Sequence, residues 1–133
     1  MARRKPIGEV RQIISEALKP LLPRAWKFFP YRVPTEAING TTVWLKLSSI
    51  EKLPEAPQSR AHVVTYTVTV AVPEADLSEA DARLDDDVIV LVHALDALPN
   101  IRRTRAEQVS VADAYLGFDI TVEIITYPIT TQE

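Results

Sequence analysis

The sequence predicts an α+β fold: a mainly antiparallel sheet of four to five strands with two helices, in the order α-β-β-β-α-β-β. Two stretches repeat apolar residues at helical spacing, and several others alternate with the two-residue period of a strand. The strands are mostly consecutive in the chain, which favours hairpins over crossovers. With 133 residues, 47% of them hydrophobic, we expect one domain with its own core. It spans residues 1–133, with a basic arm at 1–6 and a tail at 128–133.

The first predicted element is a helix over Ile7–Lys19. Its apolar residues recur at steps of three and four. Pro20 and Pro23 end it. The next segment, Arg24–Arg32, is rich in aromatic residues, and Pro30 interrupts it. We therefore expect a strand at the edge of the sheet, where a missing amide donor is tolerated. The apolar stripe of the helix is formed by Ile7, Val10, Ile14, Ala17, Leu18 and Leu21.

Two central strands form an extended hairpin. Thr41–Ser48 alternates, so its apolar residues face one way while Thr42, Trp44 and Lys46 face the other. Ser49–Arg60 contains two prolines and mixed charge, which predicts a long loop at the hairpin tip. Ala61–Val72 is the strongest predicted strand, because its β-branched residues suit both faces of a sheet. One face of that strand carries His62, Val64, Tyr66, Val68, Val70 and Val72.

The second helix is predicted from a Ser78 cap to about Leu98. Its apolar spacing indicates one core-facing stripe, and its further apolar residues predict that a second surface covers the helix. Arg105–Ala112 and Tyr115–Tyr127 then form a hairpin. Gly117 lies inside that last strand, which indicates a bulge or a close approach of another backbone segment. The core stripe consists of Leu84, Val88, Leu91, Val92, Leu95 and Leu98, and the second side of Ile89, Val90 and Ala94.

The residues that usually carry chemistry are sparse. There is no cysteine, the three glycines are isolated, and His62 and His93 stand far apart. We therefore expect no enzyme activity, no cofactor and no metal site. Asp85, Asp86 and Asp87 are consecutive, so on a helix they fan over about 200° and cannot chelate one ion together. A solvated helix face is the ordinary interpretation of this run; contact with a basic patch on a neighbouring subunit is the alternative.

Charge is unevenly distributed along the chain. Residues 1–32 carry eight Lys or Arg and two Glu, a net +6, whereas residues 33–133 carry a net −9. Such a split favours a dipolar surface that associates with copies of itself, unless the two segments intermingle in space. The basic groups form two clusters, which together with nearby aromatic residues also suggest nucleic-acid binding, although the chain is acidic overall. These clusters are Arg3, Arg4 and Lys5, and Arg102, Arg103 and Arg105.

In combination, these segments resemble the tail terminator proteins of long, non-contractile-tailed bacteriophages. The resemblance covers roughly residues 7–127. Its parts are an amphipathic helix over Val10–Leu18, an aromatic strand leaving through Tyr31–Pro34, the strands Thr42–Leu47 and Val63–Val72, a helix over Leu84–Leu98 followed by Pro99, Asn100 and Ile101, and a final strand over Tyr115–Val122.

The resemblance implies a structural virion protein with a mainly antiparallel sheet. Six subunits of such a protein close into a ring that caps the tail tube, ends tube polymerisation and joins the tail to the head–tail connector. The implied partners are further copies of the chain, the tube protein and the connector or stopper protein, with DNA passing through the lumen without specific binding. The implied location is the head-proximal end of the virion tail, with assembly in the host cytoplasm.

Three groups of residues are candidate contacts in such a ring. The basic arm Arg3, Arg4 and Lys5 faces the lumen or a partner. A predicted hairpin loop reaches the tube or connector through Glu51, Lys52, Leu53, Glu55, Gln58 and Arg60. The predicted subunit interface consists of Asp85, Asp86, Asp87, Ile89, Val90, Ala94, Arg102, Arg103 and Arg105.

Other functions remain open at this point. The chain could be another neck component, such as a head–tail connector or stopper, or a tail tube subunit. A small-ligand domain would present a concave pocket with convergent polar groups. A nucleic-acid-binding module would retain DNA in a salt-dependent way. No membrane partner is expected, because the longest apolar run, Val88–Val92, is far too short to span a bilayer.

Overall fold

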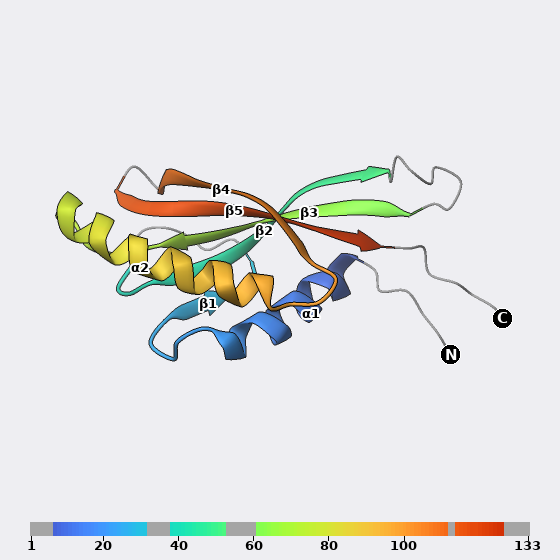
Figure 1. Ribbon diagram of the computed structural model, residues 1–133, viewed down its shortest axis with the longest axis horizontal. Helices are drawn as coiled ribbons and strands as arrows, with labels where there is room; N and C mark the ends of the chain where they lie inside the picture. Colours follow the sequence, from blue (N-terminus) through green and yellow to red (C-terminus); the bar gives the residue numbers. More distant parts are fainter. Residues whose placement is uncertain (1–6, 32–37, 53–60, 112–113, 127–133) are drawn as a thin grey trace.

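The computed structural model describes residues 7–31, 38–52, 61–111 and 114–126. Two α-helices and five strands follow one another in the predicted order, which confirms the α+β class, and a short 3₁₀ helix that was not predicted follows the first α-helix (Figure 1). The basic arm Arg3, Arg4 and Lys5 and the tail lie outside the described residues. The elements are α1 (Ile7–Leu18), η1 (Lys19–Leu21), β1 (Lys27–Phe29), β2 (Thr42–Lys52), β3 (His62–Ala71), α2 (Leu77–Asp96), β4 (Arg102–Val111) and β5 (Tyr115–Thr126).

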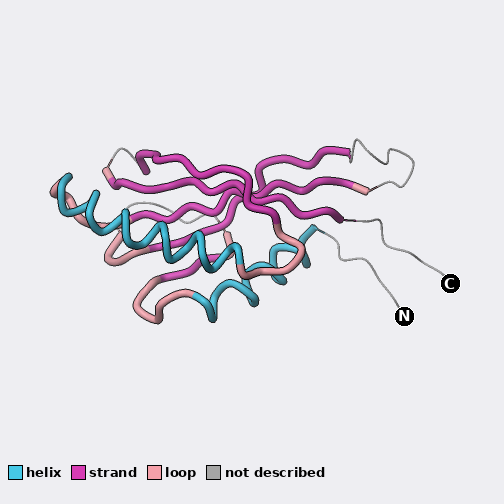
Figure 2. Tube along the Cα trace, in the orientation of Figure 1, coloured by secondary structure: helices cyan, strands magenta, loops and turns pink. Residues whose placement is uncertain are grey.

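The five strands form one sheet in the order β1-β2-β3-β5-β4. Three of the four strand pairings are antiparallel, and β1 runs parallel to β2. The sheet is therefore mixed, although mainly antiparallel as predicted. β1 occupies an edge, as the interruption at Pro30 indicated. Both α-helices lie on one side of the sheet, which gives the molecule two layers (Figure 2).

The main core lies between the helices and the sheet. α1 contributes Val10, Ile14 and Leu18 to it, and the predicted face of β3 is buried from Val64 to Val72. These side chains share one face because residues two apart in a strand point the same way. The predicted stripe of α2 is confirmed: Leu84, Val88, Leu91, Leu95 and Leu98 are buried, and Val92 packs against them.

A second, smaller cluster lies on the opposite face of the sheet. It buries Trp44 together with Ile38, Ala71 and Val111, and Tyr115 packs against it while its hydroxyl accepts a hydrogen bond from the Ile38 amide at 3.2 Å. The alternation of β2 predicted a half-buried strand, yet both faces are covered at its start: Thr42 and Trp44 are buried, and of the three residues predicted to face outward Lys46 alone is exposed.

Several predicted boundaries are wrong: β1 covers only Lys27–Phe29 of the predicted Arg24–Arg32, and β4 begins at Arg102 and not at Arg105. β2 continues to Lys52, through a bulge between Leu47 and Ser49, so Ser49–Lys52 is strand and not loop. The N-cap of α2 is Asp76 and not Ser78: the Asp76 carboxylate accepts hydrogen bonds from the Ser78 and Glu79 amides at 2.9 and 3.2 Å. The helix ends at Asp96, just before the predicted end.

Candidate interaction surfaces

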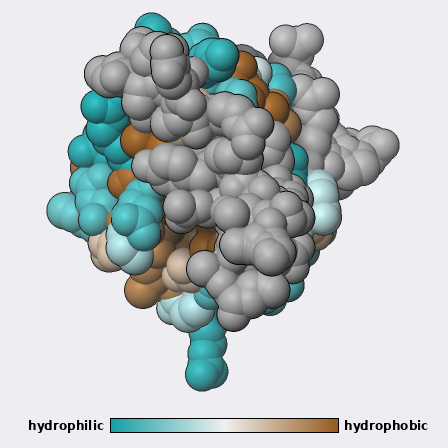
Figure 3. Space-filling view, turned by 90° about the vertical axis from the view of Figure 1, so that its right-hand side faces the viewer, coloured by the Kyte–Doolittle hydropathy of each residue, from teal (hydrophilic) through white to brown (hydrophobic). Residues whose placement is uncertain are grey.

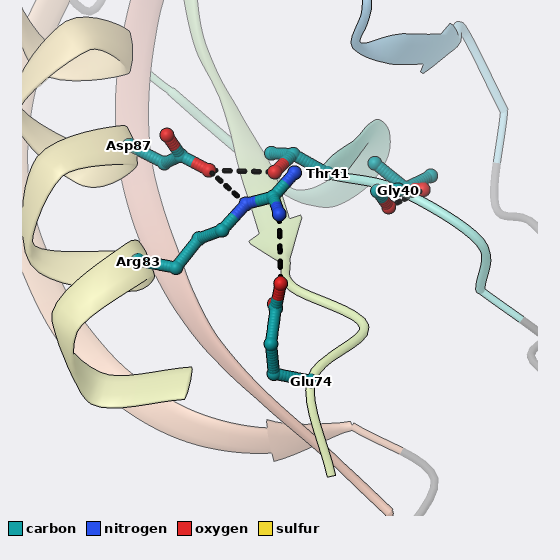
Figure 4. Close-up of polar contacts among 6 residues, drawn as sticks. Gly40, Thr41, Glu74, Arg83 and Asp87 are labelled. Atoms are coloured by element: carbon teal, nitrogen blue, oxygen red, sulfur yellow. Dashed lines mark hydrogen bonds and ion pairs between the residues drawn. The ribbon is translucent and has the colours of Figure 1, made fainter. Parts of the chain in front are cut away.

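The three consecutive aspartates of α2 have different surroundings. Asp87 is largely covered, with 16% of its side chain exposed, and its Oδ2 accepts a 2.6 Å hydrogen bond from the Thr41 hydroxyl (Figure 4). Arg83 lies 3.6 Å from the same oxygen and donates to Glu74 at 2.7 Å. This chain of contacts joins α2 to the segments before β2 and after β3. Reversing the charge of Asp87 would therefore disturb the fold as well as any subunit contact.

The outward side of α2 is formed by other residues of the predicted interface. Asp85 and Asp86 are exposed, and Ile89 and Val90 are 54% and 38% exposed. Ala94 was predicted to share this side, but it is buried in the core of its own subunit. The reason is rotation: at 100° per residue, Ala94 lies about 140° from Ile89 around the helix, toward the sheet. Of the three residues predicted to face a second covering surface, only Ile89 and Val90 therefore point outward.

The arginines of β4 all have carboxylate partners within the same subunit. Arg102 contacts Glu123 at 2.5 Å. Arg103 contacts Asp96 at 2.9 Å, and this hydrogen bond lowers the pKa of the Asp96 carboxyl and raises that of Arg103. Arg105 contacts Glu107 at 2.7 Å. Exposed pairs of this kind contribute little to stability, but they neutralise the cluster that sequence analysis offered as an interface.

Arg11 of α1 is bound inside the subunit. Its Nη1 donates to the backbone oxygens of Pro30 and Leu45, at 2.5 and 3.3 Å. Its guanidinium also lies over the rings of Tyr31 and Tyr66, at 4.7 and 5.3 Å from their centroids. Burial raises the pKa of the Tyr66 hydroxyl, and the nearby Arg11 charge opposes that shift. This basic group of the N-terminal segment therefore anchors α1 to the sheet.

The far ends of β2, β3 and β5 extend past the helices, toward the right of Figure 1. Glu51 and Lys52 are exposed at the end of β2. Ile50 is 45% exposed on the same strand, and Ile125 is 48% exposed near the end of β5. Viewed from this end, apolar surface shows in separate patches among hydrophilic side chains (Figure 3). The remaining residues of the predicted contact loop, Leu53, Glu55, Gln58 and Arg60, lie outside the described residues.

An open groove of about 510 Å³ lies where η1 leads into β1. Its apolar walls include Trp26 and Phe28, and Lys19, Arg24 and Glu16 also line it. From the sequence, Trp26 and Phe28 were expected on an edge strand, and no groove was predicted there. The signal that the sequence offered was Pro20 and Pro23, which end the helix and line the groove.

The ion pairs of the described residues bear directly on the charge split. The five that the structure shows all join two groups within residues 33–133. In the described part of residues 1–32, Lys19, Arg24 and Lys27 are exposed and form no ion pair with another described residue. The same holds for Asp81, Asp85 and Asp86 of α2. The two charged segments therefore do not neutralise each other through contacts between described residues.

Within the described ranges, no three His, Asp or Glu side chains are grouped closely enough to hold a metal ion. None of the helices in these ranges combines the length and apolar character needed to cross a bilayer. Comparison of the chain with protein-family models and with curated proteins found no match.

Proposed function

We propose that this chain is a structural virion protein, a tail terminator. In this role copies of the chain form a ring that caps the tail tube, stops its polymerisation and presents a surface to the head–tail connector. The ring has two axial faces, one for each partner, and DNA passes through its lumen. In this role the chain acts through the contacts that its surfaces make with other copies, with the tube and with the connector.

The observation that carries this proposal is the match between the order of the elements and the segments in which the resemblance lies. The predicted amphipathic helix is α1, the long strand is β3, the second helix is α2 and the closing strand is β5. These elements build the mainly antiparallel sheet that the resemblance implies. Apolar side chains are exposed on α2 and at the far end of the sheet, as they also are on α1, η1 and β1, and all of these are available for contact with a partner.

The test is assembly with tube protein from the same genome. Native mass spectrometry of the purified chain should reveal one closed ring, and electron microscopy should show a single ring at one end of each tube. Addition of the chain to polymerising tube protein should shorten the tubes as its concentration rises. Uncapped tubes of unchanged length would refute the proposal.

The same images separate the rival functions. A tube subunit would polymerise alone into stacked rings, and a connector or stopper would bind at the head side without limiting tube length. A nucleic-acid-binding module would retain DNA on a filter at low salt and release it as salt rises. Each of these outcomes would replace the terminator assignment with another.

A further inference from the structure

The outward side of α2 has a particular pattern of apolar and charged residues. Ile89 projects into solvent, and Asp85 and Asp86 precede it by four and three residues. Residues at these spacings are neighbours on a helix surface. Ile89 therefore has two carboxylates beside it, neither of which pairs with another described residue. This side of α2 carries an apolar centre with negative charge at its border.

The groove at η1 and β1 has the opposite pattern. Trp26 and Phe28 give it apolar walls, and Lys19 and Arg24 stand at its border without an ion pair among the described residues. The acidic residue of its lining, Glu16, accepts a 3.0 Å hydrogen bond from Gln12 on the same helix. The groove is open, and its volume of about 510 Å³ exceeds that of one side chain.

We propose that the groove of one copy of this chain binds the outward side of α2 of a second copy. Ile89 then packs against Trp26 and Phe28, while Asp85 and Asp86 face Lys19 and Arg24. The proposal rests on the proposed function in that a ring needs a repeated contact between subunits. Because two different patches meet, the contact is head-to-tail, and such contacts close into rings when their rotation allows it.

Charge complementarity favours a second copy over other occupants. The chain itself carries an acidic patch that complements the basic border of the groove, namely Asp85 and Asp86 of α2. The net charges of residues 1–32 and 33–133 are also of opposite sign. Contacts between unlike charges at the border of an apolar patch guide association and set its register. They also make association weaker at high ionic strength, because exposed charges are screened.

The experiment is a charge swap. One variant carries Asp85→Lys and Asp86→Lys, a second carries Lys19→Glu and Arg24→Glu, and a third combines all four substitutions. Each pair of substitutions should lower the self-association constant, measured by sedimentation equilibrium at low salt, roughly tenfold or more. The four together should recover most of this loss, because the charges again match. Ile89→Ser should weaken association at low and high salt alike.

Control variants separate this contact from a general effect of charge or folding. Lys46→Glu reverses an exposed charge on β2 and should leave association unchanged. Circular dichroism and thermal unfolding should show that every variant folds; where a reversal does not fold, the Asn and Gln variants at the same positions replace it and should weaken association to a lesser degree.

The outcomes distinguish this contact from the proposed function. A wild-type chain that stays monomeric at every concentration, paired variants that associate like the wild type, or a fourfold variant without recovery would each overturn the contact. Rings that cap tubes despite the paired reversals would overturn the contact and leave the terminator function standing. If copies associate through this contact but tube length does not change, the terminator function is overturned and the contact stands.

Discussion

At Gly117 the sheet has no room for a side chain. A Cβ placed there would lie 2.6 Å from the backbone oxygen of Val70 and 3.2 Å from a methyl group of Val111. The first of these atoms belongs to the backbone of β3 and cannot rotate away. The interpretation of Gly117 as a point of close backbone approach is therefore confirmed, and it could be made from the sequence because glycine inside a strand otherwise only weakens it.

Gly117→Ala should lower the free energy of unfolding by about 2–3 kcal/mol, because the added methyl group forces β5 away from β3. Urea unfolding measures this change. The control is Gly40→Ala, where the nearest atom to a new Cβ is the Ala25 backbone oxygen at 4.0 Å; this variant should stay within about 0.5 kcal/mol of the wild type. Equal stability of the two variants would contradict the close approach.

Asp76 gives the N-terminus of α2 a pH-dependent cap. Hydrogen bonds from the Ser78 hydroxyl and from the Ser78 and Glu79 amides lower the pKa of its carboxyl below the usual 3.8. A pKa lower in the folded than in the unfolded chain means that the stabilisation is full above the unfolded value. It is lost as pH falls through the folded value.

Asp76→Ala should therefore unfold at a lower temperature than the wild type at neutral pH, because the first amides of α2 lose their acceptor. The difference in melting temperature should shrink as pH falls below about 4. Asp76→Asn retains a capping oxygen without a titrating group, so its stability relative to Asp76→Ala should not change over that range. A gap between wild type and Asp76→Ala that does not narrow as pH falls would contradict the assigned contribution of the Asp76 charge to the cap.

At the scale of elements, α2 has two sides with opposite roles. Leu91 is fully buried on the sheet side, and Ile89 is 54% exposed on the other. Leu91→Ala should lower the free energy of unfolding by about 2–5 kcal/mol through lost burial and a cavity. Ile89→Ala should change it by about 0.5 kcal/mol or less. Denaturant titrations of both variants test this, and a large loss at Ile89 would show that the helix is oriented differently.

The hydrogen bond from Thr41 to Asp87 connects α2 to the start of β2. Thr41 is 1% exposed, so Thr41→Val leaves a covered carboxylate without this donor. The variant should lose about 1.5–3 kcal/mol of unfolding free energy, the range for hydrogen bonds to charged groups. Thr65→Val is the matched control, because Thr65 lies partly exposed on β3, where a β-branched residue is well accommodated. Similar losses in the two variants, measured by chemical denaturation, would count against the Thr41 contact.

The elements were predictable to different degrees, for physical reasons. Helix and strand periods depend on local spacing, so α2 and β3 could be located from the sequence with their core faces. The burial of Trp44 could not, because it depends on Ala71 and Val111, which are distant in the chain. The choice of Asp76 over Ser78 as the cap is also local, but both residues are good caps and two positions separate them. The parallel pairing of β1 with β2 required knowledge of how the chain passes from the end of β1 to the start of β2.

The candidate surfaces were less predictable than the fold. Sequence spacing identified Asp85, Asp86 and Ile89 as outward-facing, since a helical period assigns them a side. It could not foresee that Arg103 would find Asp96 or that Arg102 would find Glu123, because those partners lie on other elements. Nor could it assemble the groove, whose walls come from η1, β1 and the turn between them.

For the whole molecule, the proposed function assigns separate tasks to α2 and to the far end of the sheet. Exchanging the charges at the end of β2 with Glu51→Lys and Lys52→Glu leaves the net charge unchanged. Rings should still form, because the groove and α2 are untouched, but binding to the tube or connector should weaken. Electron microscopy of tube lengths measures this effect, with Lys46→Glu as a control on the same strand. Normal capping by the exchanged variant would exclude this end of the sheet from the axial contact.

The two clusters on opposite faces of the sheet also provide optical reporters. The chain has two tryptophans: Trp26 lines the groove, and Trp44 is buried in the second cluster. A Trp44→Phe variant leaves indole fluorescence only at the groove, and a Trp26→Phe variant leaves it only beneath the opposite face. The emission maximum of the first should shift to the blue when a partner excludes water from the groove, while that of the second should stay constant. Docking and folding can thus be followed separately, in real time, without attaching a dye.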